Sequence, residues 1–190
     1  MACGNITVGS SANCDNLPVG GTRTRIVLVN TDDLNANSAF TEDGSQRITD
    51  VNLIAGRSGY TVTGFRNDIK ALAEVVNPTV GLNQFSHGTG FVVYERTQAV
   101  KNELVEKVAK GRFVAFVEMK GRDADALVCL GKDVGLEIVA GPIFNAHENG
   151  GFFVITLKTP EGEYESKLPQ TVGTSYSNGQ DILDNVIAGS

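Results

Sequence analysis

The sequence predicts a mainly β protein, a single-domain β-sandwich or partial barrel that carries one amphipathic helix at about residues 97–110. Short runs of apolar and β-branched residues recur along the chain, and glycine-rich turns separate them. Of the 190 residues, 22 are glycine, which indicates many turns. Hydrophobic residues make up 41%, and a chain of this length buries a core without a metal or disulfide staple.

The chain divides into an arm, a sandwich domain and a second arm. Residues 1–21 are rich in Gly, Ser and Asn and predict an N-terminal arm. Residues 22–170 form the predicted β-sandwich domain, which opens with a strand over 22–30 and continues with a long polar loop over 31–46. Loops of this length inside a compact domain are often functional. Residues 171–190 predict a C-terminal arm with a short helix at 180–188.

Further strands are expected where apolar and β-branched residues lie between turn signals. The segments are 47–54, 60–65, 91–95, 112–119, 126–130, 136–139, 151–159 and 164–167. Residues 67–76 fit a helix and a strand about equally well, so the sequence leaves both open. Pro78 ends this segment in either case.

The helix at 97–110 is predicted by an apolar stripe with helical spacing. Two acid–base pairs four residues apart support it, each with the acid first. Gly111 is placed to end the helix as its C′ residue. The stripe consists of Val100, Leu104, Val105 and Val108, and the pairs are Glu103–Lys107 and Glu106–Lys110.

Charge and hydropathy exclude several classes of partner. The formal net charge of −6 argues against a nucleic-acid scaffold or an anionic membrane surface. The N-terminus has no basic region followed by an apolar stretch, so we expect no secretory signal. Apolar runs such as 113–117 are far shorter than the ~20 residues that cross a bilayer. We therefore expect no membrane partner and synthesis in a cytoplasm.

The three cysteines do not form a closed disulfide set. Cys3 and Cys14 are either free thiols, as a reducing cytoplasm favours, or joined across a small loop. Cys129 lies in an apolar run and is expected to be a small buried side chain. None of the three has the spacing of a zinc or redox site.

The sequence shows no catalytic motif, and we expect no enzyme, no cofactor and no metal. Neither His87 nor His147 has a second metal ligand at a familiar spacing, and both read as loop or strand-end residues. The segment 131–135 resembles a phosphate loop only in its Gly and Lys content, and a turn between strands explains it better. An unrecognised site that uses His147 and Glu148 is the remaining enzymatic alternative.

Several runs of residues are similar to virion structural proteins of tailed bacteriophages that infect Bacteroidetes hosts, including crAss-like phages. The runs are ITDV at 48–51, GFRND at 64–68, FVVYE at 91–95, GRFVAFVE at 111–118 and GKDVGLE at 131–137. The order of strands, single helix, strands and a late apolar hairpin resembles tail tube proteins and the related tail ring or terminator proteins. The resemblance covers most of residues 45–170 and contains no catalytic signature.

This resemblance implies a structural subunit of a phage tail, made in the bacterial cytoplasm and located in the virion. Its implied partners are copies of itself in a ring or stacked tube, other tail or connector proteins, and genomic DNA that passes without specific binding. The negative charge suits such a channel, because like charges repel DNA. The loop 31–46 stands where a ring-stacking loop is expected, and its candidate contact residues are Asp32, Asp33, Leu34, Asn35, Phe40, Glu42 and Asp43.

Two other interpretations remain open at this point. The chain is equally suited to a single-ring connector or terminator between portal and tail, and the sequence does not choose between 6 and 12 copies. A soluble β-sandwich binding module is the second alternative. The absence of Trp and an aromatic content of only 7% weigh against sugar stacking by such a module.

Overall fold

A computed structural model describes residues 20–65, 68–78, 81–148 and 150–189. The predicted N-terminal arm lies outside the described residues, apart from Gly20 and Gly21. The described chain is mainly β, and two open sheets pack face to face as in a β-sandwich, which confirms the predicted fold class. Both sheets are antiparallel throughout.

The larger sheet has five strands in the order β11-β8-β7-β1-β4. Their bounds are β1 Thr22–Asn30, β4 Tyr60–Thr63, β7 Phe113–Met119, β8 Leu127–Leu130 and β11 Gln170–Thr171. The smaller sheet has four strands in the order β5-β6-β10-β9, with bounds β5 Lys70–Val76, β6 Gln84–Val93, β9 Glu137–Ile138 and β10 Phe153–Lys158. The first core fills the space between the two sheets and includes Ile26, Phe91 and Ile155.

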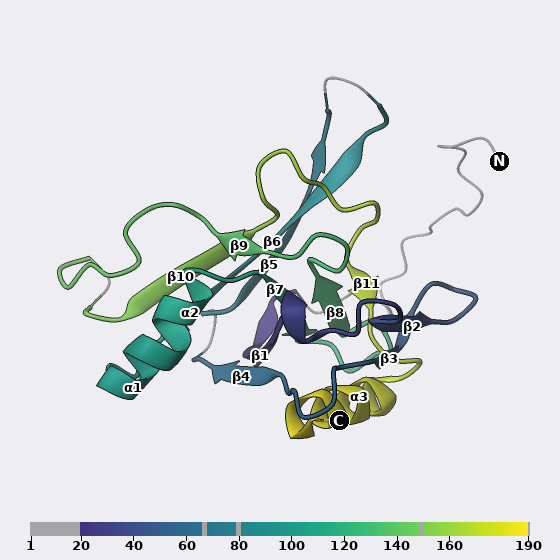
Figure 1. Cartoon of the computed structure of the whole chain (residues 1–190), viewed down its shortest axis with the longest axis horizontal. Helices are drawn as coiled ribbons and strands as arrows, with labels where there is room; N and C mark the ends of the chain where they lie inside the picture. Colours follow the sequence, from purple (N-terminus) through teal and green to yellow (C-terminus); the bar gives the residue numbers. More distant parts are fainter. Residues whose placement is uncertain (1–19, 66–67, 79–80, 149, 190) are drawn as a thin grey trace.

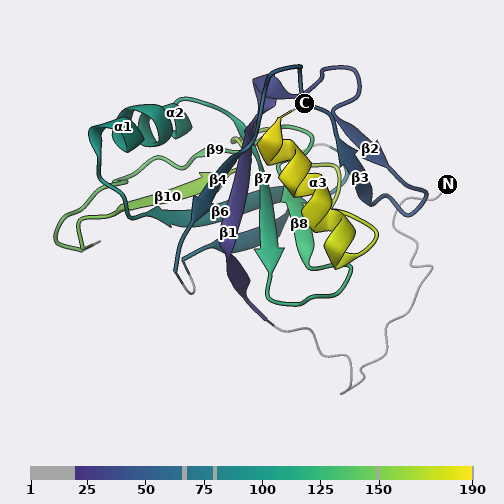
Figure 2. The same cartoon turned by 90° about the horizontal axis from the view of Figure 1, so that it is seen from below.

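The five-stranded sheet is buried on both faces, which explains the continuous apolar runs of β1 and β7. Its second face carries a separate core, covered by the helix α3 (Tyr176–Ala188) and by a hairpin of β2 (Phe40–Glu42) with β3 (Ile48–Val51). Figure 2 shows α3 crossing this sheet over β7 and β8. The molecule therefore has three layers rather than two.

The C-terminal segment is part of the folded domain and is not a separate arm. Its helix begins at Tyr176, four residues before the predicted start, and Ser175 caps it by accepting a hydrogen bond from the backbone N–H of Asn178 at 3.2 Å. Leu183 and Val186 are 1% and 2% exposed in the second core. Burial on the sheet of its own chain orders this segment without a neighbouring subunit.

The segment 31–46 is not a loop throughout, which corrects the prediction. It begins with a single 3-10 turn, η2 (Thr31–Asp33), and then contains β2, which pairs with β3. Leu34 bridges to Leu53, and both side chains belong to the second core. The polar composition of this segment predicted a loop, although its few apolar residues pack in the second core and part of it forms a strand of a hairpin.

The helix predicted at 97–110 is present over residues 98–108. It comprises α1 (Gln98–Val100), a π-helical turn η3 (Lys101–Val105) and α2 (Glu106–Val108). Thr97 is the N-cap, and both predicted ion pairs form along the exposed face. Gly111 does not have the positive φ of a C′ glycine; an added Cβ there would lie 2.9 Å from Cζ of Phe113. Close packing therefore explains this glycine better than a helix cap does.

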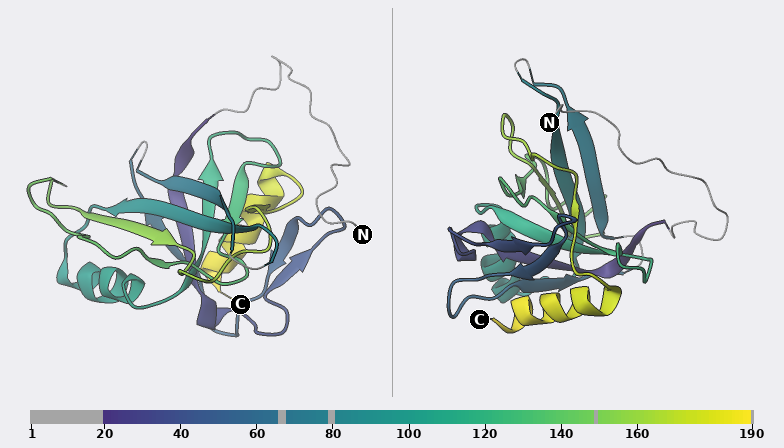
Figure 3. Two further views of the ribbon diagram at one scale, coloured as in Figure 1. Left: turned by 90° about the horizontal axis from the view of Figure 1, so that it is seen from above. Right: turned by 90° about the vertical axis from the view of Figure 1, so that its right-hand side faces the viewer.

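Residues 70–76, which the sequence left open between helix and strand, form strand β5. The strand β6 begins at Gln84 and is longer than the predicted 91–95. Residues 164–167 do not form a strand; Glu165 makes only an isolated bridge to Phe85. Figure 1 shows the far part of the β5–β6 hairpin projecting from the body of the molecule, and the second view in Figure 3 shows the same projection.

Candidate functional site

Most of the predicted contact residues of segment 31–46 are engaged within their own chain. Asp33 is 7% exposed, and its carboxylate accepts a hydrogen bond from the side-chain amide of Asn30 at 2.5 Å and lies 3.3 Å from Nε of Arg57. Leu34 is buried against Leu53. The side chain of Asp32 is exposed. Of this first group, only Asp32 is thus free to meet another molecule.

The remaining predicted contact residues hold the β2–β3 hairpin in place. Glu42 forms ion pairs with Lys132 and with Lys167, the latter at 3.3 Å, and hydrogen bonding from Lys132 lowers the pKa of this carboxyl. Phe40 packs against the second core, with Nζ of Lys132 5.8 Å from its ring centroid. Asp43 accepts hydrogen bonds from two backbone N–H groups of the hairpin turn.

Asn35 has a similar local role. Its backbone N–H donates to the carbonyl of Asn52 at 3.0 Å, and its side-chain oxygen accepts from the backbone N–H of Asn37 at 3.2 Å. A contact of any of these residues with a neighbouring subunit stays a prediction. Only the exposed atoms of these residues could make such a contact, because their buried side chains are already engaged.

A buried polar cluster surrounds His87, which lies inside β6 and not at a loop or strand end as expected. Its side chain is 2% exposed. Nδ1 accepts a hydrogen bond from the backbone N–H of Gly131 at 3.2 Å, so Nε2 carries the proton and donates to the carbonyl of Lys167 at 2.9 Å. Burial lowers the pKa of this imidazole. His87 is a neutral structural residue that joins β6 to two loops.

The segment 131–135 is a turn, as expected, and its backbone N–H groups already hold a carboxylate. Glu165 is 1% exposed and accepts hydrogen bonds from the backbone N–H groups of Asp133 at 2.9 Å and Val134 at 3.2 Å. Burial raises the pKa of Glu165. A phosphate would have to displace this side chain, so the turn is not available as an anion site.

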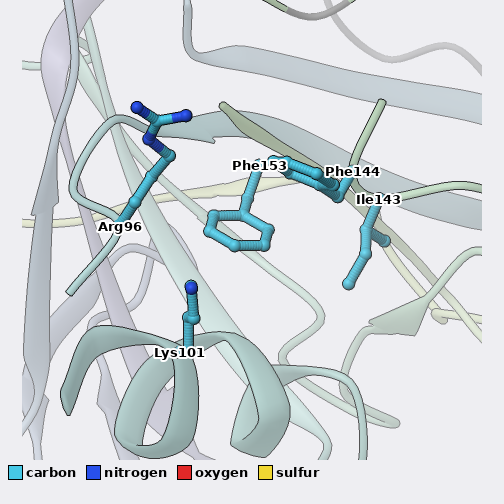
Figure 4. A pocket seen from close by; sticks show the side chains of 5 residues that line it. All are labelled: Arg96, Lys101, Ile143, Phe144 and Phe153. Carbon is cyan, nitrogen blue, oxygen red and sulfur yellow. The ribbon is translucent and has the colours of Figure 1, made fainter. Parts of the chain in front are cut away.

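A recess with two cations and an aromatic floor lies between the helix that starts at Gln98 and the beginning of β10. Its volume is about 550 Å³, and its lining residues are Arg96, Lys101, Ile143, Phe144 and Phe153. Figure 4 shows Lys101 rising from the helix toward the ring of Phe153, with Arg96 on one side of this ring and Phe144 on the other. The rings of Phe144 and Phe153 are 5.2 Å apart.

Within the described part of the chain, no carboxylate lies within ion-pair distance of Arg96 or Lys101. Arg96 only donates a hydrogen bond to the carbonyl of Gly151 at 3.3 Å. The recess therefore suits an anionic group attached to an apolar body. Sequence reasoning missed it, because nothing in the spacing of Arg96 and Lys101 distinguishes them from solvated surface cations.

A second groove of about 590 Å³ runs beside β5 and crosses the outer face of the four-stranded sheet. Gly88 and Gly90 of β6 leave its floor open, since neither has a side chain. Its walls include Thr22 and Met119 at one end and Leu72 and Thr156 along the sheet. Leu72 is 50% exposed, so the groove offers apolar surface to solvent.

Within the described ranges, His147, Glu148 and Cys129 show no catalytic arrangement. His147 and Glu148 are exposed in a loop, where Asn145 accepts hydrogen bonds from both of their backbone N–H groups. Cys129 is fully buried, as expected, and burial raises the pKa of its thiol. Among the described residues there is no cluster of three metal-ligating side chains, and none of their helices is long and apolar enough to cross a membrane.

Comparison with protein-family models, with curated proteins and with solved structures finds no match to this chain.

Proposed function

We propose that this chain is a structural subunit of a bacteriophage tail that assembles into a homo-oligomeric ring or stacked tube through which DNA passes. The proposal places the protein in the virion, with other tail or connector proteins as neighbours and with no catalytic role. It rests on the resemblance of residues 45–170 to virion proteins. The sandwich-like fold, which is the fold this resemblance implies, is consistent with it.

The observation that carries the proposal is a group of exposed apolar side chains on a projecting element. The β5–β6 hairpin projects from the body, and it exposes Leu72, Val75 and Leu82 at 50%, 62% and 68%. Large apolar side chains that stay exposed on a projecting element are typical of a subunit that is buried by its neighbours. Two buried polar side chains, His87 and Glu165, are engaged by backbone groups of their own chain.

The experiment is electron microscopy of negatively stained, purified protein. Rings or striated tubes of uniform width are expected, and the ring mass gives the copy number. Uniform rings that never stack would favour the single-ring connector or terminator. Particles without any closed symmetry would contradict the proposal.

Segment 31–46 is tested with exposed positions only. Deletion of residues 33–44 would remove the buried Leu34 and the strand β2, so it would damage the fold. The variant Asp32→Lys/Asn37→Lys changes two exposed side chains instead, and we expect it to turn tubes into separate rings. Asn185→Lys, on the exposed face of α3, is the matched control and should stack normally. Unchanged stacking of the first variant would remove segment 31–46 from the interface.

The recess beside Lys101 favours one alternative, a β-sandwich module that binds a small anionic ligand with an apolar body. Phenyl phosphate is a suitable probe, because its phosphate matches the two cations and its ring matches Phe144 and Phe153. Calorimetric titration should then show binding that Arg96→Ala/Lys101→Ala abolishes. Absence of binding at millimolar phenyl phosphate would dispose of this alternative.

A further inference from the structure

The strand β5 is an open edge of the four-stranded sheet. Among the described residues it pairs only with β6, in an unbroken antiparallel register from Lys70–Gly90 to Val76–Gln84. It contains no proline and no bulge. Natural sheets use such devices, and charged side chains as well, to discourage pairing at an edge, so a partner of β5 must complement the charges of Lys70 and Glu74.

The backbone direction of β6 follows from the contacts on its other side. The N–H and C=O of Phe85 both bond to Glu165, at 3.0 and 2.8 Å, and the C=O of His87 accepts from the N–H of Thr159 at 2.9 Å. Phe85 and His87 therefore direct their backbone groups away from β5. Successive residues of a strand alternate, so Gly88 directs its backbone groups toward β5.

The same alternation fixes which groups of β5 are free. Leu72 is the register partner of Gly88, so its backbone N–H and C=O face β6. Ala71, Ala73 and Val75 then direct their N–H and C=O groups to the open edge. These are the groups that a further strand would bind.

One end of this edge is already closed. The hydroxyl of Thr22 donates to the carbonyl of Ile69 at 2.5 Å, which occupies the edge just before Ala71. Beyond that point the strand runs into the projecting hairpin, away from the body of the molecule. Residues 71–74 have no backbone partner on this side among the described residues, so a partner strand can pair with 70–74 when its own residues after Glu74 turn aside before Thr22.

The side chains of residues 70–74 are complementary to themselves in an antiparallel register. Lys70, Leu72 and Glu74 share the outer face of the sheet. When two copies of β5 meet about a two-fold axis at Leu72, Lys70 lies opposite Glu74 of the second copy, and the two leucines face each other. Oppositely charged cross-strand pairs stabilise such a contact, and so do apolar ones.

Other two-fold registers are less favourable. An axis at Ala73 places Leu72 opposite Glu74, and an axis at Glu74 places two carboxylates opposite each other. Lys70 has no carboxylate within ion-pair distance among the described residues, while Glu74 lies 2.7 Å from Lys158. Pairing about Leu72 gives Lys70 the partner it lacks.

We propose that β5 pairs with β5 of a second copy of this chain, antiparallel and centred on Leu72, so that two four-stranded sheets become one continuous sheet. The contact is isologous, because the same residues meet from both sides. It goes beyond the proposed function, since it concerns the purified protein and does not require a phage.

A disulfide cross-link tests the register directly. In a Cys3→Ser/Cys14→Ser background, Leu72→Cys should form a covalent dimer on mild oxidation. Leu72 faces its counterpart at a non-hydrogen-bonded position, where the Cα atoms of a strand pair are about 4.5 Å apart, within disulfide range. Val75→Cys is the matched control, because Val75 is more exposed than Leu72 but lies roughly 20 Å from its counterpart in this register.

A second variant tests the hydrogen bonds. Ala73→Pro removes an N–H that points to the second copy and leaves the bonds between β5 and β6 intact. Two such donors are lost from the dimer by symmetry, and we expect dimerisation to weaken roughly tenfold or more. The melting temperature of the dilute protein should change little, which separates this effect from misfolding.

Three outcomes would overturn the proposal. The first is no cross-link by Leu72→Cys, and the second is an equally fast cross-link by Val75→Cys. The third is a Leu72→Cys cross-link that appears only after deletion of residues 1–19, which would assign the edge to that segment. Rings without the cross-link would refute this contact and leave the proposed function standing; cross-linked dimers that never form rings would do the reverse.

Discussion

The backbone N–H of Gly131 donates a hydrogen bond to Nδ1 of His87 across 3.2 Å, in the interior of the molecule. This bond fixes the neutral tautomer of the imidazole and joins β6 to the turn that follows β8. Because the other ring nitrogen donates to the carbonyl of Lys167, the ring has no free group for catalysis. His87, which the sequence placed at a loop or strand end, is thus a structural bridge inside the fold.

The neutral state of His87 predicts a pH dependence of stability. Burial lowers its pKa in the folded state, so below the ordinary value of about 6.5 the unfolded chain binds a proton that the folded chain refuses. The free energy of unfolding should be steady above about pH 6.5 and fall as the pH drops below it. Denaturant titrations between pH 7.5 and 5.5 measure this.

His87→Gln is the control for the pH effect, since it removes the titrating group. The variant should be less stable at every pH but show a smaller slope between pH 6.5 and 5.5. Glu165 has the opposite effect. Because its pKa is raised in the folded state, the free energy of unfolding increases as the pH falls through that folded-state pKa. Equal slopes for the variant and the natural chain would refute the assignment to His87.

In the turn at 131–135, the addition of a single methyl group to Gly131 should strongly reduce the stability of the fold. Gly131 has φ +72°, and a Cβ there would lie 2.6 Å from Cγ of Leu136, which is fully buried. Gly131→Ala should lower the free energy of unfolding by roughly 2–4 kcal/mol. Gly162→Ala is the matched comparison, because Gly162 has φ +85° with open space around it and should cost only about 1–2 kcal/mol. Equal losses would mean that the contact with Leu136 is unimportant.

The burial of α3 predicts that the C-terminal segment contributes to the stability of the isolated chain. Leu183→Ala should cost roughly 2–5 kcal/mol, because the side chain is 1% exposed in the second core. Asn185→Ala on the exposed face should change stability little. Chemical denaturation of dilute protein separates the two. A Leu183→Ala variant as stable as the natural chain would indicate that residues 171–190 form an arm that does not stabilise the isolated domain.

The burial of Cys129 predicts that its thiol is unreactive in the folded protein. Burial raises the pKa of its thiol, so the reactive thiolate is suppressed in the folded state. In the Cys3→Ser/Cys14→Ser background, a thiol reagent should label no residue under native conditions and one residue in denaturant. Rapid native labelling would show that the sheet around Cys129 opens readily.

Strong local patterns were enough to predict part of this fold. The strand Thr22–Asn30 was predicted with the bounds that the structure has, because its apolar core lies between polar and glycine-rich flanks. The helix beginning after Thr97 was predicted from its apolar stripe and its two acid–base pairs. In both cases the pattern and the tertiary environment favour the same conformation.

Where long-range contacts determine the conformation of a segment, the sequence alone did not predict it. Residues 70–76 became a strand through pairing with β6, and the alternation of Leu72 and Glu74 with alanines fits either element. The segment 31–46 is polar, yet Leu34 and Phe40 join a core whose other members lie far away in the sequence.

The candidate sites were predicted less well than the fold. Asp33 and Glu42 are charged residues in a polar segment, and their intrachain partners, Arg57 and Lys132, cannot be read from spacing. The recess at Arg96 and Lys101 depends on a loop that returns to the helix, so no local signal marks it. Surfaces formed by segments that are distant in the sequence cannot be predicted from a single sequence.

The proposed role as a self-assembling structural subunit determines the mass of the protein in solution. The most direct measurement is the mass of the full-length protein by light scattering over a wide range of concentration, with electron microscopy of the same samples. We expect closed rings or stacked tubes whose mass is a fixed multiple of 20.1 kDa. A monomer of 20.1 kDa at every concentration would contradict it.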